Sequence, residues 1–143
     1  MKELRQKGIP VATVPFHGLV TAVSRATFAI VGAESVLENG GMISSSGTQQ
    51  LGLLIKSFSK DFYIAAESHK FVRVFPLSPG ELGLEDGLLD FYTDSNEDCS
   101  GKPAENGHVR LDFIAPDLIT ALVTESGILA PNAVSEELIK LWN

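Results

Sequence analysis

The fold of this chain is decided by a stretch that begins Phe28-Ala29-Ile30-Val31-Gly32 and ends Phe62-Tyr63-Ile64-Ala65-Ala66. Both ends are short apolar runs, typical of strands that are buried on both faces of a sheet. Between them we expect a helix that begins at Thr48, because Thr caps helices and the apolar residues that follow have helical spacing. The helix would turn one stripe toward the core, made of Leu51, Leu54, Ile55 and Phe58.

The flanking residues continue this alternation of strands and helices. Residues 1–7 are expected to end a helix that stops at Gly8, and a second helix is expected to end at Arg25. Further strands are predicted at residues 11–14 and 108–114. Two more helices are predicted, one from Pro116 through Leu118, Ile119 and Leu122 to near Gly127, and one from Ser135 through Leu138, Ile139 and Trp142.

Short buried strands that alternate with amphipathic helices predict an α/β fold. The pattern is that of a Rossmann-like three-layer domain with a mostly parallel sheet, covered on both faces through right-handed crossovers. In such sheets ligands bind beyond the carboxyl ends of the strands. Those ends correspond here to residues 15–18, 32–39 and 67–70.

Length and composition set further limits. With 143 residues, the chain is expected to be one domain, residues 1–143, in which the polar stretch 94–107 forms an exposed insertion loop. A net charge of −7 disfavours direct nucleic-acid binding, and no apolar run is long enough to predict a membrane span. Cys99 has no partner for a disulfide, and with three His it predicts no metal site, so we expect a cytoplasmic protein.

Two glycine-containing turns offer backbone N–H groups to an anion. They are Asn39-Gly40-Gly41 and Gly47-Thr48, the second at the expected start of a helix. The chain lacks both a GxGxxG pattern and the Lys of a phosphate-binding GxxxxGK[ST] loop, which argues against nucleotide hydrolysis. The alternative is that the glycines serve a tight turn and that Thr48 only caps its helix.

Two other segments carry candidate chemistry or contacts. Glu67-Ser68-His69-Lys70 gathers an acid, a hydroxyl, an imidazole and an ammonium, although a solvated or ion-paired loop is the simpler interpretation. His17 and His108 are interpreted as structural and Cys99 as inert. The apolar run at residues 71–77 is either an interface, to which Phe and Arg are suited, or a core strand.

These segments resemble one known family. Residues 31–34, 39–41, 47–51, 62–77 and 130–139 are similar to the eukaryotic translation initiation factor 2B alpha, beta and delta subunits and their related sugar-phosphate isomerases. The resemblance implies a C-terminal Rossmann-like domain, with the family's N-terminal helical domain absent. Isomerases of the family carry a catalytic Asp where this chain has Glu34, and an Asn-Lys pair where it has serines. Glu34 and residues 67–73 are most similar to the alpha subunits.

The resemblance implies a non-catalytic regulatory subunit of the complex that exchanges guanine nucleotide on initiation factor 2. Its expected partners are the other subunits of initiation factor 2B, initiation factor 2 with a phosphorylated alpha subunit, and a second copy of itself. No cofactor is expected. The alternative is a sugar-phosphate isomerase with altered active-site residues. A vestigial pocket for a sugar phosphate or nucleotide would comprise Glu34, Asn39, Gly40, Gly41, Ser45, Gly47 and Thr48. The interface with a partner would comprise Phe71, Val72, Arg73, Phe75, Leu77, Leu138 and Trp142.

Overall fold

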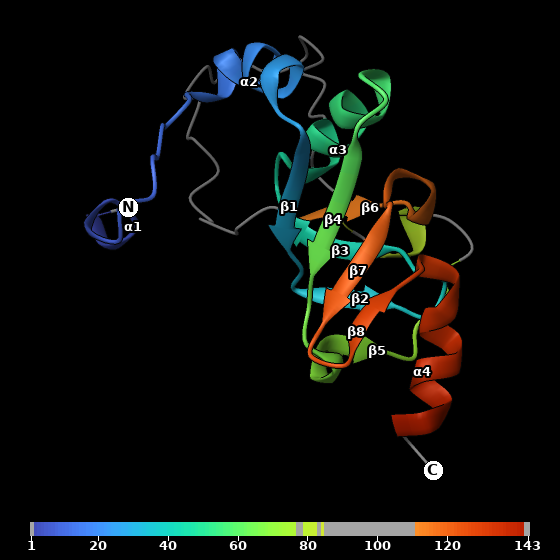
Figure 1. Ribbon diagram of the computed structural model, residues 1–143. Coiled ribbons are helices and arrows are strands. Elements are labelled where there is room, and N and C mark those ends of the chain that lie inside the picture. The colour runs from blue at the N-terminus through green and yellow to red at the C-terminus, as the bar shows by residue number, and fades with distance from the viewer. Residues whose placement is uncertain (1, 77–78, 83, 85–110, 142–143) are drawn as a thin grey trace, which may run out of the picture.

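The computed structural model describes residues 2–76, 79–82, 84 and 111–141 (Figure 1). Four α-helices are assigned there: α1 (Lys2–Gln6), α2 (Leu19–Arg25), α3 (Thr48–Ser57) and α4 (Val134–Leu141). Short 3-10 turns cover Phe16–Gly18, Ser68–Lys70, Pro79–Leu82, Pro116–Leu118 and Pro131–Ala133. None of the described helices is long and apolar enough to cross a bilayer.

The strands in the described part of the chain form two sheets of four. In the first, β1 (Phe28–Gly32), β4 (Asp61–Ala65) and β7 (Ala121–Thr124) are parallel, and β8 (Gly127–Leu129) adds antiparallel to β7. The second sheet has the order β5 (Phe71–Val72), β2 (Ser35–Leu37), β3 (Met42–Ser45) and β6 (Leu111–Ile114). Its β2–β5 pair is parallel, and its other pairs are antiparallel.

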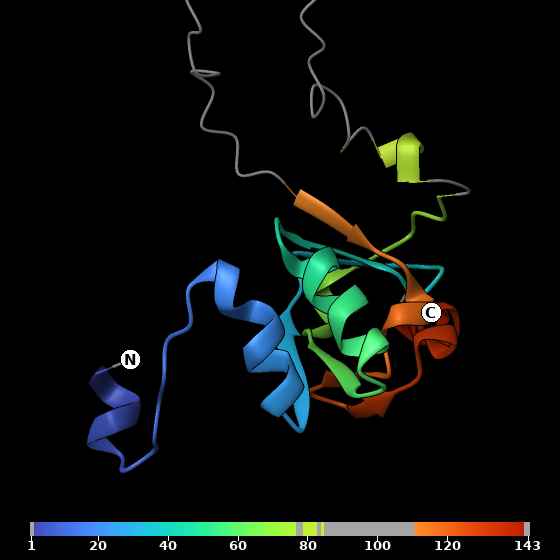
Figure 2. The ribbon, with the colours of Figure 1, turned by 90° about the horizontal axis from the view of Figure 1, so that it is seen from above.

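The core lies between the two sheets, where α3 is placed (Figure 2). The inner face of the first sheet contributes Phe62, Ile64 and Leu122, all fully buried. Ile55 of α3 and Met42 of β3 meet them from the other side. The packing of α3 and β3 on this face covers the parallel strands. Because β1, β4 and β7 are parallel, their carboxyl ends lie at the same edge of the sheet.

The α/β class and the mostly parallel first sheet are confirmed. The strands expected at residues 28–31 and 62–66 and the helices expected to end at Gly8 and Arg25 are present, and Gly8 has φ +75°. The helix expected after residue 47 is present, but Gly47 with φ +95° is its cap and Thr48 its first residue. Likewise the last helix begins at Val134, not Ser135.

Two predicted elements are wrong. Residues 11–14 are extended but pair with no strand, because they lie apart from both sheets (Figure 1). The helix expected from Pro116 to Gly127 is a 3-10 turn followed by β7 and β8, so the spacing of Leu118 and Leu122 was misleading. Pairing with β4 decided the outcome: the Thr120 N–H donates to the Phe62 carbonyl at 2.8 Å, and the Thr120 hydroxyl accepts from the Phe62 N–H at 2.9 Å.

Other expectations are met in part. The β2–β3 hairpin was not predicted, and the run at residues 71–77 forms a strand only over Phe71–Val72. Both faces of the sheet were expected to be covered, yet on the face of the first sheet turned away from α3 the side chains of Phe28, Ile30 and Ile128 are exposed. Outside the described residues lie the insertion loop 94–107, Leu77, Cys99, residues 108–110 and Trp142.

Candidate functional site

The carboxyl ends of β4 and β7 open onto a cavity of about 250 Å³. Its floor is made of small apolar side chains, and its rim carries charged and hydroxyl groups. This is the edge at which the parallel strands were expected to gather functional residues. The lining residues are Ala65, Ala66, Glu67, Lys70, Val123, Thr124 and Glu125.

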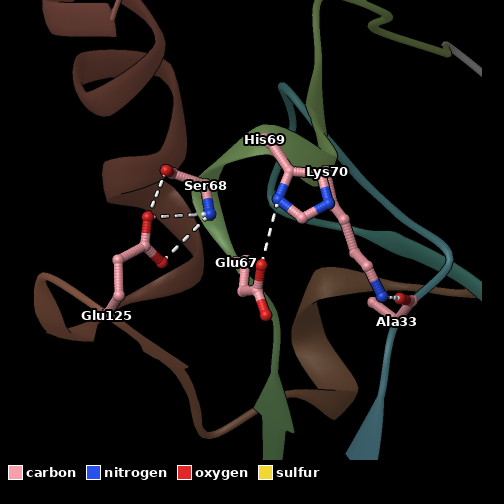
Figure 3. Close-up of polar contacts among 6 residues, drawn as sticks. All are labelled: Ala33, Glu67, Ser68, His69, Lys70 and Glu125. Atoms are coloured by element: carbon pink, nitrogen blue, oxygen red, sulfur yellow. Dashed lines mark hydrogen bonds and ion pairs between the residues drawn. The ribbon is translucent and has the colours of Figure 1, made fainter.

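The polar residues at this edge are bonded to one another (Figure 3). The Lys70 ammonium donates to the Ala33 carbonyl at 2.7 Å, which ties the turn after β4 to the end of β1. The Glu67 carboxylate lies 3.2 Å from His69 Nδ1. The Ser68 N–H donates to both carboxylate oxygens of Glu125, at 3.2 and 3.1 Å, and its hydroxyl donates to the same group.

Ser68 and His69 therefore contact different carboxylates. Ser68 points to Glu125, while His69 points to Glu67, so the pair is not arranged as a nucleophile and its base (Figure 3). The Ser68 hydroxyl bond is the largest cause that lowers the pKa of Glu125 below its usual value, and the charge of His69 adds to it. Both oxygens of the Glu125 carboxylate therefore already accept hydrogen bonds from Ser68.

The turn at residues 39–41 connects β2 to β3 and is buried. Gly40 has φ +81°, and a Cβ there would lie 2.2 Å from the Pro131 carbonyl oxygen, so only glycine fits. Its N–H donates to Leu37 at 2.9 Å, and the Gly41 N–H donates to the Asn39 side chain at 2.9 Å. The tight-turn interpretation explains Gly40, whereas at Gly41 a Cβ would lie 2.8 Å from the Phe113 ring; neither amide is free for a ligand.

The start of α3 is capped by a residue that sequence reasoning missed. The Asp112 carboxylate of β6 accepts from the Gly47 N–H at 2.7 Å and from the Gln49 N–H at 3.0 Å. A carboxylate of the chain itself thus takes the position in which an external anion would sit. No local signal could reveal it, because Asp112 is 65 residues from Gly47 in the sequence.

The structure separates the residues predicted as a ligand pocket from the cavity. Ser45 and Thr48 bond to each other through the Thr48 hydroxyl and the Ser45 carbonyl, at 2.7 Å. Glu34 is exposed, and its N–H pairs with Ile43. The cavity lining includes none of the seven predicted residues: Glu34, Asn39, Gly40, Gly41, Ser45, Gly47 and Thr48.

Some of the residues predicted as an interface are buried, and others are exposed. Phe71 and Leu138 are buried in the core, at 6% and 1% exposure, and so cannot meet a partner directly. Val72 is half-buried and Arg73 exposed, whereas Phe75 is 60% exposed. We call Val72–Phe75 the apolar edge, since the Val74 carbonyl accepts from the Glu38 N–H and so extends the pairing of β5 with β2.

Metal ligands are not gathered in the described part of the chain. No group of three or more His, Cys, Asp or Glu side chains there is close enough to hold an ion. His17 lies in the turn before α2, away from the cavity lining. The described residues thus offer the cavity, with its Lys70 ammonium, and the apolar edge as the two candidate surfaces.

Curated proteins similar to this chain include subunits of a translation factor and sugar-phosphate isomerases. It is 38% identical to translation initiation factor eIF2B subunit alpha of Dictyostelium discoideum, over 97% of this chain and 45% of that protein. It is 33% identical to the same subunit of Caenorhabditis elegans, over 99% and 44%. A more distant relative is the methylthioribose-1-phosphate isomerase of Pelotomaculum thermopropionicum, 30% identical over 90% and 36%. The chain thus spans less than half the length of these relatives.

A solved structure gives the same fold. The chain superimposes on eIF2B beta from Chaetomium thermophilum with a TM-score of 0.73 and 21% identity, over 97% of this chain and 35% of that one. This similarity confirms the Rossmann-like fold. The model of the initiation factor 2 subunit family matches residues 1–131. The chain therefore belongs to the initiation factor 2 subunit family.

Proposed function

We propose that this chain is a non-catalytic regulatory domain of an alpha-type subunit in the eIF2B complex, which exchanges guanine nucleotide on initiation factor 2. The observation that carries the proposal is the identity of 38% and 33% to two eIF2B alpha subunits over almost the whole chain. In this role the domain acts in the cytoplasm and helps the complex respond to initiation factor 2 with a phosphorylated alpha subunit.

The apolar edge supports assembly as the way this domain acts. Phe75 and Val74 are 60% and 45% exposed beside the exposed Arg73, and aromatic and Arg side chains are typical of the centre of an interface. We assign this surface to contacts with a second copy and with other eIF2B subunits. The amides of the glycine turns are already bonded within the chain, which favours assembly over a phosphate-dependent reaction.

A small phosphate ligand would be held at the cavity instead of the glycine turns. Lys70 lines the cavity, and within the described residues its ammonium donates to a neutral carbonyl and forms no ion pair. Its positive charge is the group that would attract a sugar phosphate or nucleotide, against the repulsion of the Glu67 and Glu125 carboxylates in the same lining. Lys70→Gln should abolish any rise in melting temperature that such a ligand produces.

The test is assembly with purified eIF2B subunits. The chain, and the variants Phe75→Glu and Leu53→Glu, are mixed with the other subunits and analysed by size-exclusion chromatography. Leu53 is the matched control, because it is an apolar residue on α3 with 54% exposure. We expect the wild type and Leu53→Glu to co-elute with the complex and Phe75→Glu to elute alone. Failure of the wild type to co-elute, at concentrations well above those of the subunits, would contradict the proposal.

Regulation needs a separate readout. Nucleotide exchange on initiation factor 2 is measured with and without phosphorylation of its alpha subunit, in complexes that contain or lack the chain. We expect the chain to change the inhibition by the phosphorylated factor and to leave the basal exchange rate unchanged. An unchanged inhibition would overturn the regulatory part of the proposal while leaving assembly intact.

The second candidate function is isomerisation of a sugar phosphate. The 30% identity to a methylthioribose-1-phosphate isomerase favours it, and the exposed Glu34 is the carboxylate that would act as the base. We expect no turnover of methylthioribose 1-phosphate by proton NMR. Turnover by the wild type that is lost in Glu34→Gln would establish the isomerase instead.

A further inference from the structure

The turn between β2 and β3 contains an Asn-Gly step. Asn39-Gly40 lies in the described part of the chain, whereas the second such step, Asn106-Gly107, lies outside it. In an Asn-Gly step the backbone nitrogen of the glycine can attack the side-chain amide of the asparagine, and no Cβ obstructs its approach. Such a step is therefore open to deamidation, a covalent change that needs water and no enzyme.

Both reacting groups of this step are held in hydrogen bonds. The Gly40 N–H, which must lose its proton before the nitrogen can attack, donates to the Leu37 carbonyl at 2.9 Å. The Asn39 side-chain oxygen, bonded to the carbon that would be attacked, accepts from the Gly41 N–H at 2.9 Å. These bonds fix the nitrogen and the side-chain amide in separate positions. The reaction therefore requires the turn to open.

The segment that leads into α4 keeps the turn closed. Gly40 is buried, and a Cβ on it would overlap the Pro131 carbonyl (Figure 1). Pro131–Ala133 is the 3-10 turn that runs directly into α4. Val134 and Leu138 fix α4 in the core, at 0% and 1% exposure. The turn can therefore open only when residues 131–133 move, and the docked α4 opposes that movement.

We propose that Asn39 is a deamidation site whose rate is set by the release of α4 from the turn. In the open turn, solvent base takes the Gly40 amide proton, and the nitrogen forms a bond to Cγ of Asn39. The Cγ–Nδ2 bond breaks, and Nδ2 leaves as ammonia with a proton from water. Water then opens the succinimide ring at either carbonyl, which gives aspartate or isoaspartate. The net reaction converts one amide and one water into one carboxylate and one ammonium ion.

The two products differ in how they fit the turn. Aspartate leaves the main chain unchanged, and its oxygen can still accept from the Gly41 N–H. Isoaspartate adds a methylene to the main chain beside Gly40, which has φ +81° and no spare room against Pro131. The turn cannot close again around it. Because the Glu38 N–H donates to the Val74 carbonyl at 3.1 Å, loss of the turn also loosens the apolar edge.

Peptide mass spectrometry tests the site. Trypsin releases residues 26–56, whose only asparagine is Asn39, so this peptide reports on the site separately from Asn106. The chain is incubated at neutral pH, either folded or unfolded in guanidinium chloride, and isoaspartate in the peptide is quantified with isoaspartyl methyltransferase. We expect Asn39 to deamidate about a hundredfold more slowly in the folded chain. Equal rates would overturn control by the turn, and no isoaspartate in the unfolded chain would overturn the site.

Two leucine variants test whether α4 controls the opening. Leu138→Ala removes a buried side chain from α4, and Leu122→Ala removes an equally buried one from β7 of the first sheet, whereas the turn belongs to the second. We expect Leu138→Ala to raise the folded-state rate at Asn39 about tenfold more than Leu122→Ala does. The same rise in both would overturn control by α4.

Hydrogen exchange of the wild type gives the same test without variants. The bonded Gly40 amide should open with the same free energy as the amides of α4, because one movement releases both. A Gly40 amide that exchanges much faster than α4 would contradict the proposal even if either leucine variant fails to fold.

Discussion

The glycine turns and the apolar edge differ in whether their groups have partners within the chain. At the turns, the N–H groups of Gly40, Gly41 and Gly47 all bond to acceptors within the protein. At the apolar edge, Phe75 is 60% exposed and Val74 45% exposed among the described residues. The region suited to binding a small anion is thus closed by its own residues, while the region suited to a protein partner is left open.

Gly40→Ala should have the largest effect, because it breaks the turn that keeps this region closed. The new Cβ would meet the Pro131 carbonyl at 2.2 Å and force alanine to φ +81°. We expect a loss of about 3 kcal/mol in the free energy of unfolding, measured by urea denaturation. Gly8→Ala is the control: it has φ +75° but open space around it, and should cost only about 1 kcal/mol. Equal costs would show that the close approach to Pro131 does not matter.

Asp112→Ala should have the next largest effect, since it exposes the start of α3. Two backbone N–H groups lose their acceptor, which should cost about 1–2 kcal/mol in unfolding free energy. In a Lys70→Gln background, added phosphate should restore part of that stability in the Asp112→Ala variant and leave the chain that keeps Asp112 unchanged. Asp117→Ala, which removes an exposed ion pair with Lys56, should cost less than about 1 kcal/mol. Stabilisation of the wild type by phosphate that survives Lys70→Gln would contradict the closed turn.

Phe75→Glu should change stability little and assembly much. The side chain is mostly exposed, so the unfolding free energy should shift by less than about 0.5 kcal/mol. By light scattering, the wild type should approach twice its 15.3 kDa mass as concentration rises, and the variant should stay at the monomer mass. A variant that dimerises like the wild type would remove the apolar edge from the interface.

Ser68→Ala should have the smallest effect, confined to one carboxylate. Without the Ser68 hydroxyl, the pKa of Glu125 should rise toward its usual value, as followed by carbon-detected NMR titration. Because the folded pKa lies below the unfolded one, the bond stabilises the wild type above the unfolded pKa. That contribution disappears as pH falls through the folded pKa. An unchanged pKa in the variant would show that the hydroxyl does not hold the carboxylate.

Local patterns predicted the elements whose stability is local. The α3 stripe and the β1 and β4 runs were found from spacing alone, and Ile55, Phe62 and Ile64 of them lie in the core, although Phe58 of the predicted stripe is 39% exposed. The hairpin of β7 and β8 was missed because Leu118 and Leu122 imitate helical spacing, and only pairing with β4 decides otherwise. Likewise Phe28-Ala29-Ile30-Val31 is apolar throughout, and nothing within it tells that one face stays exposed.

The site was harder to predict than the fold. Sequence reasoning placed residues 67–70 at a strand end, where Glu67 and Lys70 line the cavity, but it could not reveal that Asp112 reaches the start of α3 across 65 residues. It also grouped Phe71 and Leu138 with Phe75, although only the last is exposed. Tertiary packing decides which residues far apart in the sequence come into contact and which side chains are buried, and local sequence patterns show neither.

Hydrogen exchange of the chain in complex with eIF2B subunits tests the central claim most directly, because one experiment reads both regions. We predict slower exchange over residues 72–75 on assembly and no change at the bonded amides of residues 39–41 and 47–49. Slower exchange at residues 39–41 and 47–49, with residues 72–75 unchanged, would contradict the assignment of assembly to the apolar edge. It would indicate that the glycine turns are the binding region.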